Sequence, residues 1–226
     1  MSPALAITEL ALDLAPGARG PGRVGLVDLR DRADDEPAGL HADEWAHAVT
    51  LAGPRRRDFV AGRLVLRALL PGGAPALLPD DRGAPRLPPG WVGSVSHKRG
   101  RAAAAVAPDD GWSLGVDLED ARPPRLDLGP RVLTPRELAA LTAAELDPVG
   151  YGRAVTRAFS IKEAVYKAID PLVRRYVGFR EVELIVGADG GVGVVTVDPR
   201  LAGLDIRATW REHDASWVCT ARARRR

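Results

Sequence analysis

The chain has 226 residues, of which 46% are hydrophobic and 27% charged, so its composition excludes a disordered chain and allows a buried core. Its formal net charge is +2 and its pI is about 9.0, a mildly basic balance that suits phosphates, nucleic acid or an acidic partner without choosing among them. A single cysteine, Cys219, excludes an internal disulfide and a cysteine-based zinc site, and its neighbours predict a buried strand position.

No apolar run approaches the length of about 20 residues that a bilayer-spanning helix needs. The first 16 residues are apolar but carry Glu9 and Asp13 and no early lysine or arginine, which is the opposite of a secretory signal. We therefore expect a mature cytoplasmic protein, acting as a monomer without a membrane partner.

Glycine and proline punctuate the chain and divide it into two halves of similar plan. Apolar residues recur at helical spacing within 57–70, which predicts a helix there. In chain order, the first half is predicted to contain apolar stretches at 5–14 and 23–29, the second of them a strand; a helical region at 43–70, broken near Gly53-Pro54; a loop at 71–89; and strands at 91–96 and 102–107.

The second half repeats this plan and has a clear helix start, with Thr134 as N-cap, Pro135 at the first helical position and Glu137 three residues after the cap. In chain order, it is predicted to contain a strand at 113–119; a proline-rich connection at 120–130; helices from 134 and at 155–169; and three or four strands among 181–186, 192–197, 205–210 and 216–221. The tail at 222–226 is predicted to be a frayed, solvated end. The predicted fold class is therefore α+β, with two pseudo-duplicated half-domains, 1–110 and 111–226, each packing helices on a small antiparallel sheet.

Two carboxylates, Asp117 and Glu119, alternate along the strand at 113–119, so they point to the same face while Val116 and Leu118 point into the core. Neighbouring carboxylates repel each other unless a cation or a proton lies between them. A hard divalent metal such as Mg²⁺ fits this position, because it takes oxygen ligands and leaves positions for phosphates. The alternative is a half-exposed strand with a solvated face, which the spacing alone favours.

On the helix at 155–169, Glu163 and Lys167 lie one turn apart on the same side, which is either an acid and a cation for chemistry or an ordinary surface pair. A third candidate, Ser96-His97, ends a strand before a turn with three cations, a setting that suits a phosphate group. Adjacent strand residues point to opposite faces, so these two do not form a nucleophile–base pair, and a lone surface histidine remains the alternative.

Together and in this order, three motifs resemble those of the Sfp-type 4′-phosphopantetheinyl transferases, especially the subgroup of the enterobactin synthetase D component. The motifs are Ser96-His97, the strand Gly115-Val116-Asp117-Leu118-Glu119 and the helix Lys162-Glu163-Ala164-Val165-Tyr166-Lys167. The resemblance spans roughly residues 40 to 190 and includes the basic helix around Arg55 and Arg63. One departure is Ala84, which replaces a lysine of many members, so Arg82 or Arg86 is expected to substitute for it.

The resemblance implies that Asp117, Glu119 and Glu163 bind Mg²⁺, that Glu163 accepts a proton and that Lys167 neutralises a phosphate. It also implies coenzyme A contacts in the first half, from Arg55, Arg63, Arg86, Ser96 and His97, and places the metal-binding and catalytic residues in the second. On the helix, Arg63 is expected to project its charge away from the core. The implied partner is an apo acyl or peptidyl carrier protein, modified on a serine with release of adenosine 3′,5′-bisphosphate.

Two rivals come from other functional classes. A non-catalytic binder of coenzyme A, nucleotide or nucleic acid would draw on the arginines, but the aromatic content of 5% offers no stacking platform for bases, so no nucleic-acid partner is expected. A different Mg²⁺-dependent phosphotransferase lacks support, because the sequence contains no glycine-rich phosphate loop.

Overall fold

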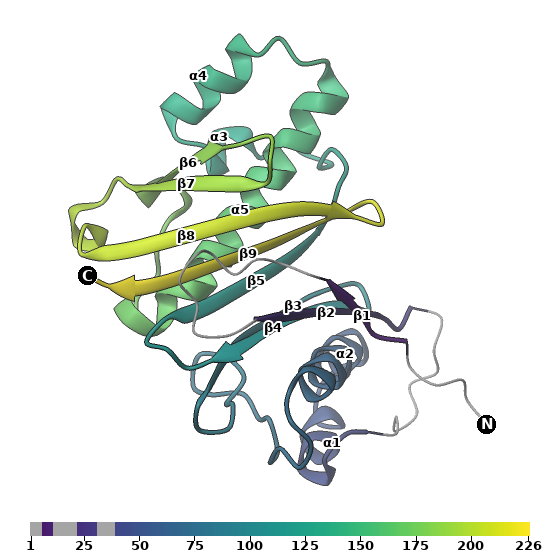
Figure 1. The fold of residues 1–226 in the computed structure, drawn as a ribbon. Coiled ribbons are helices and arrows are strands. Elements are labelled where there is room, and N and C mark those ends of the chain that lie inside the picture. Colours follow the sequence, from purple (N-terminus) through teal and green to yellow (C-terminus); the bar gives the residue numbers. More distant parts are fainter. Residues whose placement is uncertain (1–5, 11–21, 31–38) are drawn as a thin grey trace. The chain divides into compact units, whose positions relative to one another are not determined.

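The computed structural model describes residues 6–10, 22–30 and 39–226 (Figure 1). The chain divides into two compact units, Met1–Asp110 and Gly111–Arg226. Half of the apolar stretch predicted at 5–14 lies outside the described residues, and the described half contains the strand Thr8–Leu10. Among the described helices, none is both long and apolar enough to cross a bilayer.

The first unit is a four-stranded antiparallel sheet with helices on one face (Figure 1). Its strand order is β1-β2-β4-β3, and α2 supplies the apolar residues that pack on the sheet. The elements are β1 (Thr8–Leu10), β2 (Arg23–Asp28), α1 (Ala42–Ala48), α2 (Gly53–Leu69), β3 (Trp91–Lys98) and β4 (Arg101–Pro108). The predicted strand at 23–29, the helix break near Gly53-Pro54 and the strand pair at 91–107 are confirmed.

The second unit is a five-stranded antiparallel sheet in the order β5-β9-β8-β7-β6, with α5 lying along one face (Figure 1). Its strands are β5 (Ser113–Asp120), β6 (Val182–Val186), β7 (Gly191–Thr196), β8 (Leu204–His213) and β9 (Ser216–Arg225). Its helices are α3 (Gly129–Val132), α4 (Pro135–Ala143) and α5 (Pro148–Val173), with short 3₁₀ turns at η1 (Phe179–Glu181) and η2 (Pro199–Leu201). A β-carbon at Gly115 would lie 2.0 Å from the Ala164 carbonyl oxygen, so only glycine lets β5 approach α5 this closely.

Two expectations for the second unit need correction. The tail predicted to fray is the end of β9, where Arg222 and Ala223 are buried and Ala223 pairs with Ser113 of β5. The predicted helix at 155–169 extends from 148 to 173, because Asp147 caps its N-terminus by accepting the Gly150 N–H at 2.6 Å. The expectation that Cys219 lies buried on a strand is confirmed.

The two units share a topology, which supports the pseudo-duplication. In each, a strand is followed by a short and a long helix, and the first strand pairs with the last strand of a closing hairpin. The corresponding orders are β2-β4-β3 and β5-β9-β8, and the second unit adds β6 and β7 at the sheet edge.

A buried glutamate performs the same task in both units. Glu44 of α1 and Glu137 of α4 each lie three residues after the N-cap and accept its backbone N–H. Each also accepts a distant backbone N–H at 2.7 Å and binds a basic side chain from the long helix of its unit. The partners are His41, Leu77 and Arg67 for Glu44, and Thr134, Leu184 and Lys162 for Glu137. This shared device ties the helix pair of each unit to the segment that follows it.

Candidate active site

A polar stripe on α5 faces β5 in the second unit. Ser160, Glu163 and Lys167 are three and four residues apart, so they lie on one side of the helix. Opposite them, β5 carries the alternating carboxylates Asp117 and Glu119. Most of the other α5 side chains that pack on the sheet are apolar; the exceptions are Thr156, which is buried, and Arg153 and Arg157, which stack on Trp217 and Trp210.

Asp117 is held on both oxygens by side chains from α5. Lys167 Nζ donates to Asp117 Oδ1 at 2.7 Å, and it also donates to the Val116 carbonyl oxygen at 3.0 Å. The Ser160 hydroxyl donates to Asp117 Oδ2 at 2.8 Å. Because Asp117 is only 4% exposed, the alternative of a solvated strand face is wrong at this position.

The carboxyl group of Glu163 is partly buried near the charges of Asp117, Lys167 and Glu119. Burial raises the pKa of Glu163, and the negative charge of Asp117 raises it further, whereas Lys167 opposes the shift and Glu119 adds to it. Lys167 binds Asp117 across the helix–strand contact, so Glu163 and Lys167 are more than an isolated surface pair.

The donor set fits a hard divalent cation in its chemistry. The charges of Asp117 and Glu119 both raise the pKa of Glu163, so a cation among these carboxylates would relieve repulsion, and oxygen is the ligand that Mg²⁺ prefers. Within residues 6–10, 22–30 and 39–226, however, no group of three histidine, cysteine or acidic side chains is arranged closely enough to hold a metal. Asp117, Glu119 and Glu163 would therefore have to close around the ion, and Lys167 supplies the positive charge at Asp117 in this structure.

Lys162, the first lysine of the helix motif, is structural. Its side chain is fully buried, and its ammonium lies 2.7 Å from Glu137 Oε2. Nζ also donates to three main-chain carbonyl oxygens, those of Val132, Phe179 and Val182. Burial lowers the pKa of Lys162, and the hydrogen bond and charge of Glu137 oppose that shift.

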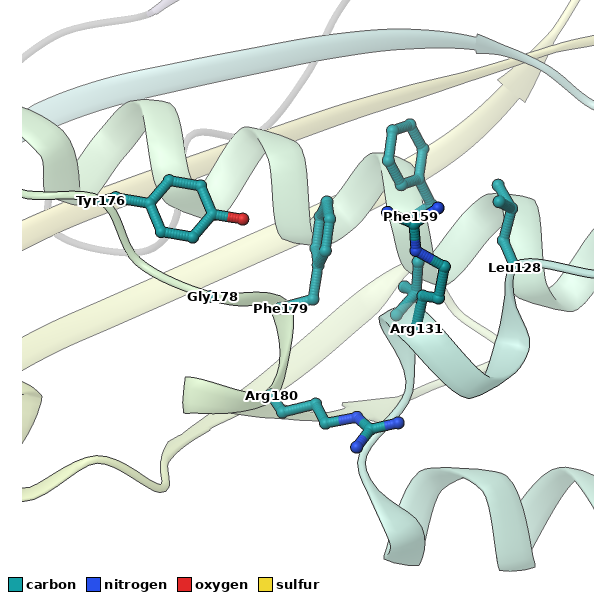
Figure 2. Close-up of a pocket in the computed structure, with 8 residues that line it drawn as sticks. Leu128, Arg131, Phe159, Tyr176, Gly178, Phe179 and Arg180 are labelled. Atoms are coloured by element: carbon teal, nitrogen blue, oxygen red, sulfur yellow. The ribbon is translucent and has the colours of Figure 1, made fainter.

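A largely apolar groove of about 590 Å³ is lined by residues of α3, α5 and η1 (Figure 2). Phe159 of α5 lines the groove one helical turn before Glu163, and Phe179 of η1 lies 5.5 Å from it, ring centre to ring centre. Two arginines, Arg131 and Arg180, also line it, and Arg180 donates to the Pro130 carbonyl oxygen.

The candidates in the first unit lie at the end of β3 and on the surface. His97 has a half-exposed side chain, and its Nδ1 lies 3.4 Å from Asp58 Oδ2. Asp58 also accepts the Gly100 N–H at 3.0 Å, which fixes the turn after His97. Ser96 is buried, as expected for a residue whose neighbour points outward. Arg55 and Arg86 are both exposed.

The expectation that Arg63 projects its charge away from the core is wrong. Arg63 is 3% exposed, its Nε donates to the Leu77 carbonyl oxygen at 2.5 Å, and its guanidinium lies 4.2 Å from the centre of the Phe59 ring. Phe59 is one turn earlier on the same helix face, so the guanidinium stacks on that ring and stays inside. Burial lowers the pKa of Arg63 to about 10. These contacts suit a residue that anchors the segment after α2.

Comparison with known proteins agrees with the motifs. The sequence model of the 4′-phosphopantetheinyl transferase superfamily matches residues 113–221, and that of the 4′-phosphopantetheinyl transferase N-terminal domain matches residues 42–107. The chain is 39% identical to the 4′-phosphopantetheinyl transferase Svp of Streptomyces mobaraensis over 71% of this chain and 67% of that one. It is 39% identical to Npt of Nocardia iowensis over 76% of each chain, and 32% identical to enterobactin synthase component D of Salmonella typhi over 53% of this chain and 50% of that one. The chain belongs to the 4′-phosphopantetheinyl transferase superfamily.

Proposed function

We propose that this protein transfers 4′-phosphopantetheine from coenzyme A to a serine of an apo acyl or peptidyl carrier protein in a Mg²⁺-dependent reaction. The serine oxygen forms a bond to the β-phosphorus of coenzyme A. The bond from that phosphorus to the bridging oxygen breaks, and adenosine 3′,5′-bisphosphate leaves.

One observation carries this proposal: the stripe of Ser160, Glu163 and Lys167 on α5 lies against the buried carboxylate of Asp117 on β5. Burying carboxylates is costly, and here Asp117 and Glu163 share one lysine, unlike the one-to-one pair of Glu137 and Lys162, so the stripe has an excess of negative charge that a cation would offset. Asp117, Glu119 and Glu163 would hold the metal. When bound, Mg²⁺ would offset the negative charge that builds on the phosphate oxygens.

Glu163 would accept the proton of the attacking serine, directly or through water. Glu163 is the carboxylate of the α5 stripe, and an ionised carboxylate within hydrogen-bond reach of the serine can act as its general base. Lys167 is 29% exposed at its side chain and has a flexible stem, so it can move from Asp117 to a phosphate oxygen. In that position its charge would stabilise the transition state.

The first unit would contribute the nucleotide contacts. His97, Arg55 and Arg86 are exposed and basic, so they can reach the 3′-phosphate and diphosphate, with Ser96 assisting from the end of β3. Arg63, whose guanidinium is buried against Phe59 and bonded to Leu77, would have no direct part in these contacts. The apolar groove next to Phe159 would receive the pantetheine arm, which is extended and has a gem-dimethyl group and methylene segments between its amides.

The test is a mass spectrum of several apo-carrier proteins from different pathways after incubation with this protein, coenzyme A and Mg²⁺. We expect one added phosphopantetheine on the carrier serine and none when EDTA is present. A Glu163→Gln variant serves as the matched control. If every carrier stays unmodified while coenzyme A binds, the protein is the non-catalytic binder and the proposal is wrong.

A further inference from the structure

The two hydrogen bonds that hold Asp117 differ in how easily they break. Lys167, on Oδ1, has a side chain that is 29% exposed, whereas Ser160, on Oδ2, is fully buried. A long lysine side chain near solvent exchanges partners readily, but the Ser160 hydroxyl is packed between α5 and the sheet. The Oδ2 bond is therefore the fixed one, and the Oδ1 bond is the replaceable one.

We propose that Ser160 is a positioning residue for Asp117: it fixes Oδ2 so that Oδ1 alone is presented to the divalent cation, and Lys167 covers Oδ1 until the cation binds. This inference rests on the proposed function. The motifs of the sequence analysis assign roles to acidic residues and lysines, and the role of Ser160 is additional to these.

The physical reason lies in the freedom of a carboxylate. Without Ser160, the Asp117 carboxylate can rotate and can turn both oxygens toward the lysine, so less of the population offers a metal-ready Oδ1. Losing a partner that orients a metal ligand typically lowers metal affinity by about 10–100-fold. A positioning role therefore predicts a weakened response to the metal without a loss of the chemical step.

The experiment measures the Mg²⁺ dependence of carrier modification in Ser160→Ala and Ser160→Cys. We expect the Mg²⁺ concentration for half-maximal rate to rise about 10-fold, while kcat at saturating Mg²⁺ stays within about 3-fold of the parent. Ser160→Cys keeps the side-chain size and weakens the donor, so it guards against a packing defect; it is assayed with a reductant, because Ser160 hydrogen-bonds the Cys219 thiol and a second thiol there could form a disulfide. Ser160→Thr keeps the hydroxyl and should restore the parent's Mg²⁺ dependence.

Thr156→Val is the matched control. Thr156 lies one turn earlier on α5, is also buried, and donates to the carbonyl oxygens of Arg122 at 2.8 Å and Gly152 at 3.0 Å, away from the carboxylates. Its loss should leave the Mg²⁺ dependence unchanged. Mn²⁺ binding in the presence of coenzyme A, followed by electron paramagnetic resonance, gives a second readout that needs no turnover and should show the same weakening for Ser160→Ala.

Unchanged Mg²⁺ dependence in both Ser160→Ala and Ser160→Cys would overturn the inference, as would a loss of kcat that excess Mg²⁺ does not restore. If the parent protein, without any substitution, transfers no phosphopantetheine, the proposed function is wrong, and that result alone does not decide the role of Ser160. The Mn²⁺ titration then decides for Ser160, because equal affinities of the parent and Ser160→Ala would contradict a positioning role.

Discussion

The structure predicts that Lys162 is needed for folding and has no part in catalysis, although it lies beside Glu163 in the helix motif. In Lys162→Met, an apolar side chain of similar length replaces the ammonium, and Glu137 keeps a buried charge without its counter-ion. Breaking a buried ion pair by removing one partner costs about 3–5 kcal/mol. Three carbonyl oxygens also lose a donor, but these costs overlap with the first and do not simply add.

At about 2–4 °C per kcal/mol for a chain of this size, the melting temperature should fall by on the order of 10 °C. The assay is urea unfolding followed by tryptophan fluorescence. Trp45 and Trp91 of the first unit are replaced by phenylalanine, so that the signal comes from the three tryptophans of the second unit.

Glu137→Gln in the same background removes the stranded charge and keeps a side chain that accepts the Leu184 N–H. The double variant with Lys162→Met should therefore be more stable than Lys162→Met alone. Two results would refute this reasoning: a Lys162→Met variant that loses less than about 1 kcal/mol, or a folded Lys162→Met variant with no transfer activity. The second would mean that Lys162 acts in the reaction.

Three further predictions follow from the side chains of the site. Glu163→Gln should lower kcat by about 10²–10⁴-fold and Lys167→Ala by less, in steady-state transfer assays; small, equal losses would leave only a surface pair. His97→Ala should raise the KM for coenzyme A about 10-fold and that for dephospho-coenzyme A much less, whereas Arg63→Met should lower the melting temperature and affect both substrates equally. Burial raises the pKa of Cys219 above its ordinary 9.0, so its contribution to stability is complete below about pH 9 and is lost as the pH rises beyond it. Cys219→Ala should therefore flatten the alkaline loss of stability in urea titrations; an unchanged slope would contradict this.

The elements with strong local signals were predictable from the sequence. The capping box at Thr134 forms as expected because cap, proline and glutamate all act within one turn. The start of α5 was missed because Gly150 and Gly152 lower helix propensity, and the reason for Gly152 lies elsewhere in the chain: a β-carbon there would come 2.6 Å from Pro123. The last strand was missed because tertiary pairing with β5 and β8 orders a tail that its charge alone would leave in solvent.

For the site, the sequence indicated which residues share a face but not which of them pair. Alternation placed Asp117 and Glu119 together, yet the bond from Lys167 to Asp117 joins residues 50 positions apart. Arg63 was misplaced because helical spacing identifies the face and not the path of a long side chain, which here folds back over an aromatic ring. The helical spacing of Ser160, Glu163 and Lys167 places the Ser160 hydroxyl on the same face as the other two side chains, and this was the one sequence feature that pointed to Ser160.

The duplicated scaffold explains why one unit carries the carboxylates. Gly25 of β2 and Gly115 of β5 occupy equivalent places, because a β-carbon at Gly25 would meet Val65 and Leu69 of α2, and one at Gly115 would meet Ala164 and Ala168 of α5. Matching the two glycines places Val65 and Leu69 of α2 at the positions of Ala164 and Ala168 of α5, and this sets the residue-by-residue alignment of the two long helices. It pairs Val27 with Asp117 and, along the helices, Ala61, Leu64 and Ala68 with Ser160, Glu163 and Lys167.

At these equivalent places the first unit is apolar throughout, and Val27, Ala61 and Leu64 are buried in its core. The same helix–strand contact thus exists in two forms, one closed by hydrophobic packing and one that holds Asp117, Glu163, Lys167 and the Ser160 hydroxyl. The packed form shows that the scaffold does not need charges at this contact. The proposed cation-assisted phosphoryl transfer would use each member of the polar stripe, which packing of this helix on this strand does not require.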